Sequence, residues 1–246
     1  MELKPVRTGE QPSLQPTTRG GYTYDAAELA ARAQGQKVLR NTYLLLALTM
    51  VPTVIGAFIG LSTSAFVVAN PGISSIVMLV GVIGLQFGIA ANRNSGVGVA
   101  LLLLMTGILG WWLGPILNFA LAMQNGPQLI GYAAVGTGVI LFAMAGVATT
   151  TKRDFSFMGK FLFVGMWALV LAAVANIFLH IPALALTVST LAIVIFSLFL
   201  LFDLNRIVRG GETNYVMAAT GVYMSLWNIF ANLLYLLMAL TGNSRD

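Results

Sequence analysis

Acidic side chains are rare in this sequence, and one of them directly follows a long apolar run. Asp203 comes after the stretch "FSLFLLF", in a chain of 246 residues that contains only 8 Asp and Glu. A carboxylate beside hydrocarbon is costly, so an acid in this position is a candidate for binding or moving a cation or a proton. The alternative is a residue at a helix end that pairs with Arg206 and reaches water. The sequence leaves both interpretations open.

A polar stripe marks the last apolar run. Ser225, Asn228 and Asn232 recur at intervals of three and four residues, with Gly221 one turn earlier, so they share one helix face. Amide side chains in hydrocarbon need partners, so this face should point into a helix bundle. Hydrogen bonds between helices explain the stripe more simply than the lining of a pore. The expected partners on the two preceding spans are Ser189, Ser197 and Asn176.

No apparatus for catalysis is visible in the sequence. Cysteine is absent, which excludes a thiolate metal site and a Cys nucleophile. The single histidine, His180, has no neighbouring acid in sequence, so we expect a solvated loop residue and not a metal ligand. No zinc motif, phosphate-binding loop or serine nucleophile motif is present. We therefore predict a protein that is not an enzyme and has no cofactor, with calcium as a transported ion at Asp203 left open.

The apolar residues occur in blocks that are long enough to cross a membrane as helices. They make up 58% of the chain, and the mean hydropathy is +0.86. Blocks of about twenty residues match roughly 30 Å of hydrocarbon and are too long for barrel strands. We predict an all-α, polytopic bundle of seven transmembrane helices within residues 40–242. The spans are expected at about 41–62, 72–91, 96–118, 129–149, 157–179, 183–203 and 215–240.

The Lys and Arg residues indicate an orientation. Six of the 13 lie in the first forty residues, and all others except Arg245 lie in or beside the second, fourth and sixth connections. Because cytoplasmic connections retain Lys and Arg, we expect a cytoplasmic N-terminus and a C-terminus on the other side. Residues 1–39 are expected to form a polar, flexible cytoplasmic tail. The net charge of +5 thus reflects topology, and we expect no nucleic-acid partner.

The sixth connection combines charges with a turn. Gly210 and Gly211 allow a sharp reversal of the chain. An acceptor just before the last span would cap its first amides, and Thr213 or Asn214 is expected to do so. Four polar residues define this predicted cytoplasmic hairpin: Arg206, Arg209, Glu212 and Asn214.

Two glycine pairs have the four-residue spacing that is typical of close helix packing in membranes. They are Gly84 with Gly88, and Gly110 with Gly114. We expect both pairs to pack helices within the bundle and not to mark a dimer interface.

Several stretches of the sequence resemble the Bax inhibitor-1 family, and within it the YccA-like branch. The likeness runs from Lys37 to the C-terminus and is most specific in its last two stretches. The stretches are "KVLRNTYLLLALT" at 37–49, "GPILN" at 114–118, "TTTKRDFSFMG" at 149–159, "VANIFLHIPAL" at 174–184 and "GGETNYVMAATGVYMSLWNIF" at 210–230.

The resemblance implies a seven-helix protein of the bacterial inner membrane, with the N-terminus in the cytoplasm and the C-terminus in the periplasm. Members of this branch associate with FtsH, a membrane-anchored ATP-dependent zinc protease that pulls on their N-terminal tails. The leading hypothesis is therefore a non-enzymatic protein that binds and modulates FtsH. The sequence indicates no oligomeric state.

The resemblance also implies an alternative function. Other bacterial relatives are pH-sensitive calcium-leak proteins, in which an Asp of the sixth helix and an Asp of the seventh form a gate near a basic residue. Asp203 in "FDLNRI" matches the first, whereas Ser225 in "VYMSLWNIF" stands in place of the second. A serine cannot share a proton as a carboxylate pair does. Arg93 is the candidate for the basic residue of this gate. A third hypothesis is a structural or stress-tolerance membrane protein that transports nothing.

Overall fold

The computed structural model describes residues 17–19, 22–24, 26–151 and 153–242, with side chains from residue 34 onward. About half of the predicted tail over residues 1–39 therefore lies outside the described residues. Within them, β1 (Thr17–Arg19) pairs antiparallel with β2 (Tyr22–Tyr24), and every other element is helical.

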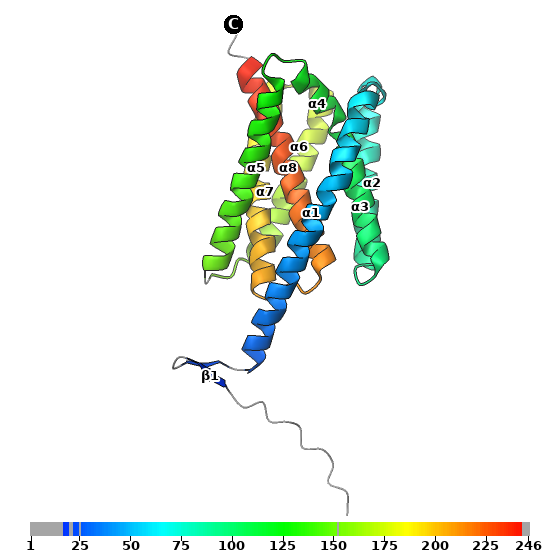
Figure 1. Ribbon diagram of the computed structural model, residues 1–246. Helices are drawn as coiled ribbons and strands as arrows, with labels where there is room; N and C mark the ends of the chain where they lie inside the picture. Colours follow the sequence, from blue (N-terminus) through cyan, green and yellow to red (C-terminus); the bar gives the residue numbers. More distant parts are fainter. Residues whose placement is uncertain (1–16, 20–21, 25, 152, 243–246) are drawn as a thin grey trace, which may run out of the picture.

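Within the part of the chain that the structure describes, seven membrane-spanning helices run alternately up and down in one bundle (Figure 1). Helices α3 and α4 together make the third span, and each of the other helices makes one. The chain is thus a polytopic membrane protein whose membrane domain is all-helical, as predicted. The helices are α1 (Ala26–Ala69), α2 (Pro71–Ala91), α3 (Gly96–Trp112), α4 (Gly114–Leu121), α5 (Gly126–Thr150), α6 (Met158–Leu179), α7 (Pro182–Val208) and α8 (Tyr215–Gly242).

Two helices are longer than the apolar pattern predicts. Helix α1 begins at Ala26, inside the expected tail, because residues 26–40 consist largely of strong helix formers such as Ala, Leu, Glu, Gln and Arg. Helix α7 continues from the expected end at residue 203 to Val208. Leu204 and Ile207 are 1% and 0% exposed, so packing of this last turn extends the helix beyond the hydrophobic run.

The third span is broken where a single helix was expected. Helix α3 ends at Trp112 and α4 begins at Gly114, with Leu113 between them. Pro115 explains the break, because it lacks an N–H donor and its ring clashes with the carbonyl of the preceding turn.

Helix α8 lies at the centre of the bundle (Figure 1). One hydrophobic cluster contains Val222 and Ile229 of α8, and a second cluster contains Leu234 and Met238 of the same helix. Residues from its start and from its end therefore join the rest of the bundle into one body.

The seam between α1 and α3 is a backbone-to-backbone contact. A Cβ atom added at Gly110 would overlap the backbone of Thr53, and one added at Gly114 would overlap Gly60. This pair packs closely, as predicted. The prediction for the other pair is wrong at Gly84, because nothing lies within 4 Å of a Cβ there. Gly88 does pack against α3, but a Cβ there would meet the Leu101 side chain at 3.3 Å and not a backbone.

Candidate functional site

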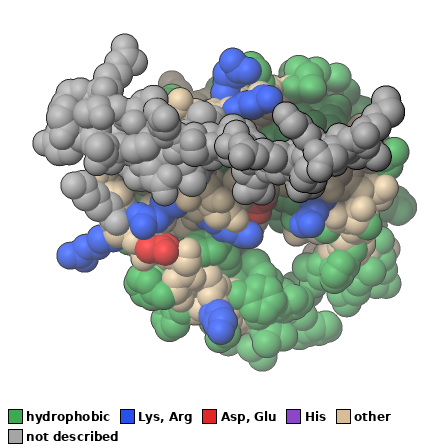
Figure 2. Space-filling view, turned by 90° about the horizontal axis from the view of Figure 1, so that it is seen from below, with side chains coloured by type: hydrophobic (Ala, Val, Ile, Leu, Met, Phe, Trp, Pro, Cys, Tyr) green, Lys and Arg blue, Asp and Glu red, His purple; other side chains and the backbone are tan. Residues whose placement is uncertain are grey.

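One end of the bundle, named here the basic end, holds the Lys and Arg residues whose side chains the structure describes. It contains the connections 92–95, 151–157 and 209–214 and the stretch of α1 near Gly35, which passes over the last carbonyls of α7. Figure 2 shows the Lys and Arg side chains spread across this face. The residues are Lys37, Arg40, Arg93, Arg153, Lys160, Arg206 and Arg209.

Asp203 lies inside the basic end, between α7 and α8. A Cβ added at Gly221 would come within 2.7 Å of Asp203 Oδ2, so the carboxylate rests against the bare backbone of that glycine. Asp203 is half-buried, more than a turn before the end of α7. Within the described residues it has no hydrogen-bond or ion-pair partner.

The pairing of Asp203 with Arg206, one of the two interpretations that the sequence leaves open, does not form. The Arg206 guanidinium Nη2 lies 3.4 Å from Glu212 Oε2, and its Nε donates to the carbonyl of Gly211 at 3.2 Å. Arg206 belongs to the last turn of α7 and turns outward to the loop, because the loop supplies both acceptors. Gly210 adopts a positive φ of 77°, which makes the reversal of the chain possible.

The polar stripe of α8 does not make the expected hydrogen bonds between helices. Asn228 Nδ2 donates to the carbonyl of Met224, and Asn232 Nδ2 donates to that of Asn228, both at 2.8 Å and both within α8. Ser225 is 3% exposed and follows Gly221 by one turn on the same face. The amides of the stripe therefore satisfy themselves locally, since carbonyls of the preceding turn are the nearest acceptors in an apolar setting.

The expected partners also bond elsewhere. Ser197 Oγ donates to the carbonyl of Ile193 on its own helix, and Asn176 Oδ1 accepts the N–H of Ile181 beyond the end of α6. Ser189 is buried, and His180 is exposed at the left-handed C-cap of α6 with a φ of 54°.

Asn214 caps α8, as one of the two predicted candidates. Its Oδ1 accepts the N–H groups of Val216 and Met217 at 3.0 and 3.1 Å. Its Nδ2 donates to the carbonyl of Arg93 and to Asn94 Oδ1, which ties the α7–α8 loop to the α2–α3 loop. Arg93 itself is exposed, and no hydrogen bond or ion pair joins it to Asp203 in the described part of the chain.

Asn205 performs a similar role that sequence reasoning missed. It is 1% exposed on α7. Its Nδ2 donates to the carbonyl of Arg153, and its Oδ1 accepts the N–H of Phe155, both at 3.3 Å. The sequence did contain a signal for this role, because Asn205 is an amide side chain only two residues after Asp203 on the same helix. Together Asn205 and Asn214 hold two other connections against the ends of α7 and α8.

Tyr223 is the second residue that the sequence did not single out. Its hydroxyl lies 2.8 Å from Thr53 Oγ1 of α1 and donates to the carbonyl of Thr106 of α3 at 3.3 Å. The ring is 2% exposed, so three helices share this buried polar contact. A hydroxyl within an apolar run is a weak signal, because only the fold reveals its partners.

The arrangement around Asp203 can support the binding of a cation or a proton. No group of three or more His, Cys, Asp or Glu that could hold a metal ion occurs among the described residues. Asp203 is a single carboxylate beside Gly221, and Ser225 follows that glycine by one turn on the same face of α8. Such a group can exchange a proton or contact a cation from one side.

The sequence matches the family described as "Inhibitor of apoptosis-promoting Bax1" over residues 35–243. That range includes all seven spans apart from the first residue of α1's membrane segment. The chain belongs to the Bax inhibitor family. The match agrees with the resemblance drawn from the sequence.

Curated relatives of this Bax inhibitor family member come from several bacteria. A protein of Vibrio cholerae, named "Uncharacterized membrane protein", is 39% identical over 88% of this chain and 96% of its own length. A protein of Escherichia coli K12, named "Modulator of FtsH protease YccA", is 41% identical over 82% of this chain and 89% of its own length. The protein of Escherichia coli O6:H1 with the same identity and coverage is named "Inner membrane protein YccA". These names describe membrane proteins and a modulator.

Proposed function

We propose that this protein is a non-enzymatic component of the bacterial inner membrane that binds the protease FtsH and modulates its activity. The observation that carries the proposal is the 41% identity, over 89% of its length, to a relative named as a modulator of that protease. A likeness that covers nearly the whole relative includes the helices through which a membrane partner would be contacted.

The arrangement of α1 supports the same proposal. The helix runs without interruption from Ala26 to Ala69 and leaves the bundle at the basic end (Figure 1). The last described residue of α8 lies at the opposite end. We infer that the basic end is cytoplasmic, since Lys and Arg are retained there, so the N-terminal segment faces the side on which an ATP-driven protease acts.

Co-purification with FtsH tests the proposal. The full chain and a chain that lacks residues 1–25 would each be solubilised with FtsH and captured through a tag on FtsH. The truncation stops before Ala26, so α1 is kept intact. We expect the full chain to be captured and to slow degradation of a membrane substrate in vesicles, and the truncated chain to lose part of that effect.

A chain that lacks residues 243–246 is the matched control, because it is shortened after the last residue of α8, Gly242, and not before α1. This control should behave like the full chain. If neither the full chain nor the truncated chain is captured, under conditions where a known membrane substrate of FtsH is, the proposed function is wrong.

A pH-dependent cation leak is the second candidate, and the position of Asp203 favours it. The carboxylate lies against Gly221 and has no hydrogen-bond or ion-pair partner within the described residues. Ser225 follows Gly221 by one turn of α8. The protein in vesicles that contain a calcium dye should then admit calcium, and Asp203→Asn should change the rate and its pH dependence. A flux equal to that of empty vesicles would eliminate this candidate, whatever the outcome with FtsH.

A further inference from the structure

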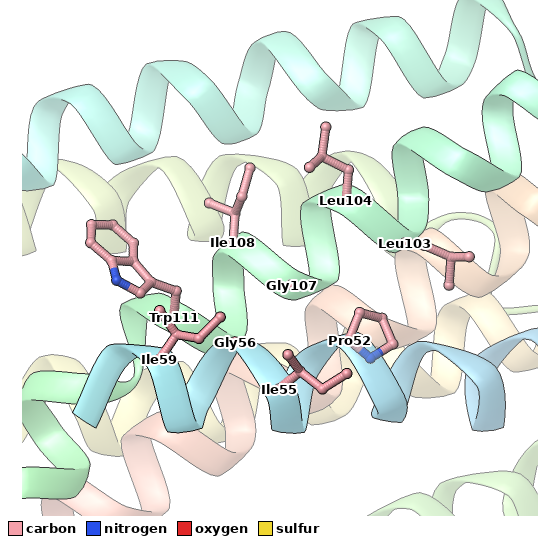
Figure 3. Close-up of a pocket in the computed structure, with 9 residues that line it drawn as sticks. All are labelled: Pro52, Ile55, Gly56, Ile59, Leu103, Leu104, Gly107, Ile108 and Trp111. Carbon is pink, nitrogen blue, oxygen red and sulfur yellow. The ribbon is translucent and has the colours of Figure 1, made fainter. Parts of the chain in front are cut away.

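Two hollows open along helix α1. The first lies at the basic end between α1 and the start of α8 and has a volume of about 640 Å³. The second is an apolar groove of about 380 Å³ between α1 and α3, shown in Figure 3. The first hollow is lined by Gln34, Lys37, Val38, Asn41, Thr213 and Tyr215.

The described side chains that line the first hollow form a set of donors without an acid. Lys37 supplies a positive charge, Gln34 and Asn41 supply amides, and Thr213 and Tyr215 supply hydroxyls. Within the described residues, none of these five side chains has a hydrogen-bond partner. A cation surrounded by neutral donors, with no carboxylate among the described lining residues, suits the oxygens of a phosphate group.

The second hollow lies on the same face of α1 as the first. Its α1 residues are Pro52, Ile55, Gly56 and Ile59, and each follows its counterpart in the first hollow by 18 positions. Eighteen positions are five full turns at about 3.6 residues per turn, so the two hollows are aligned along the helix. The polar hollow and the apolar groove can therefore be reached by one elongated molecule.

An uncovered apolar stripe connects the two hollows. Leu44, Leu48 and Val51 lie on α1 between them and are 65%, 48% and 56% exposed. Their positions continue the face of Lys37 and Asn41 at intervals of three and four residues. Residues so exposed on a membrane-spanning helix contact lipid chains.

The distance between the hollows matches one leaflet of a bilayer. Asn41 and Pro52 are 11 residues apart, which corresponds to about 16 Å along a helix. Half of the roughly 30 Å hydrocarbon thickness is about 15 Å. A lipid whose phosphate occupies the first hollow would thus bring the end of an acyl chain to the groove beside Gly56 and Gly107.

We propose that helix α1 carries a binding site for one anionic phospholipid, with the phosphodiester in the Lys37 hollow and an acyl chain along Leu44 and Leu48 to the groove between α1 and α3. A free phosphate compound would use the first hollow only, and the uncovered stripe and the groove favour the lipid. The site is independent of the proposed interaction with FtsH.

Thermal unfolding of the full chain in mild detergent tests the proposal. The probes are short-chain phosphatidylglycerol, short-chain phosphatidylcholine, the soluble headgroup glycerophosphoglycerol, and inorganic phosphate. We expect phosphatidylglycerol to raise the Tm at lower concentration than phosphatidylcholine, and the two soluble compounds to have no effect. Lys37→Gln should weaken the response to phosphatidylglycerol about fivefold, as expected for one Lys at an anionic surface.

Lys160→Gln is the matched control, because it removes the same charge from an exposed position at the same end, outside the hollow. This variant should respond like the wild type, and Lys37→Arg should retain most of the response. Equal responses of Lys37→Gln and Lys160→Gln would overturn the site. Protection by phosphate or glycerophosphoglycerol that depends on Lys37 would overturn the lipid as its occupant.

Discussion

Helices α1 and α3 approach each other through glycine, and so do α7 and α8, but the glycines meet different groups. Gly110 faces the backbone of Thr53, which cannot move without separating the helices. Gly221 faces the carboxylate of Asp203, the end of a side chain that can rotate. The first contact is packing alone. The second places an acid between two helices, where a ligand or a proton could change its contacts.

The largest effect is expected at the α1–α3 contact. Gly110→Ala adds a methyl group that overlaps the Thr53 backbone, so the free energy of unfolding should fall by about 2 kcal/mol or more. Gly84→Ala is the control: no atom lies within 4 Å of its added Cβ, and alanine favours helix by roughly 0.5–1 kcal/mol. Thermal unfolding in detergent measures both. Equal destabilisation by the two substitutions would contradict the difference between these glycine pairs.

The α7–α8 contact should respond less and should depend on Asp203. Gly221→Ala brings a methyl group to 2.7 Å from Asp203 Oδ2, and rotation of the side chain limits the loss to about 1 kcal/mol. In an Asp203→Ala background the same substitution should be nearly neutral, because the facing oxygen is gone. Unfolding of the two single variants and the double variant gives the coupling. Strictly additive losses would mean that the carboxylate does not face Gly221.

Tyr223 links the two pairs of helices, because its side chain extends from α8 to α1 and α3. Tyr223→Phe removes the hydroxyl that contacts Thr53 and Thr106, and stability should fall by about 1 kcal/mol. Tyr235→Phe on the same helix, where no hydrogen bond of the hydroxyl occurs in the described residues, should change stability by less than about 0.5 kcal/mol. A loss at Tyr235 as large as that at Tyr223 would show that the buried contact contributes nothing specific.

The smallest effect belongs to Asp154, an exposed acid in the connection held by Asn205. Hydrogen bonds from the hydroxyl and the backbone N–H of Ser156 hold the pKa of Asp154 below its ordinary value of 3.8. The folded state therefore prefers the charged form, and this stabilisation is present above pH 3.8 and lost as the pH falls further. The free energies of unfolding of the wild type and of Asp154→Asn should therefore converge in acid. A difference between these free energies that grows as the pH falls would contradict the prediction.

The parts of the fold that rest on local composition could be predicted. The second span, expected at 72–91, is Pro71–Ala91, because the length of an apolar run and its flanking breakers determine a membrane helix. The Asn214 cap follows from the same local chemistry. The end of α7 could not be predicted, because the burial of Leu204 and Ile207 depends on neighbours far away in the chain.

The candidate site was predicted only in part. Asp203 was identified because a carboxylate beside hydrocarbon is costly in free energy. Its neighbour Gly221 and the outward orientation of Arg206 became visible only in the folded chain. Asn205 was missed because its partners, Arg153 and Phe155, are about fifty positions away. The asparagines of the α8 stripe were assigned to the wrong partners, since spacing gives a face but not an acceptor.

The sequence by itself determined seven spans, the gathering of Lys and Arg at one end, and an acid at the end of an apolar run, because hydrophobicity and charge act residue by residue. Only the tertiary structure decided which glycines carry a close contact, which helix Asp203 faces, and that the two hollows on α1 lie on one exposed face. These properties depend on which surfaces of distant segments meet, and equal local patterns such as Gly84 with Gly88 and Gly110 with Gly114 have different neighbours in the bundle.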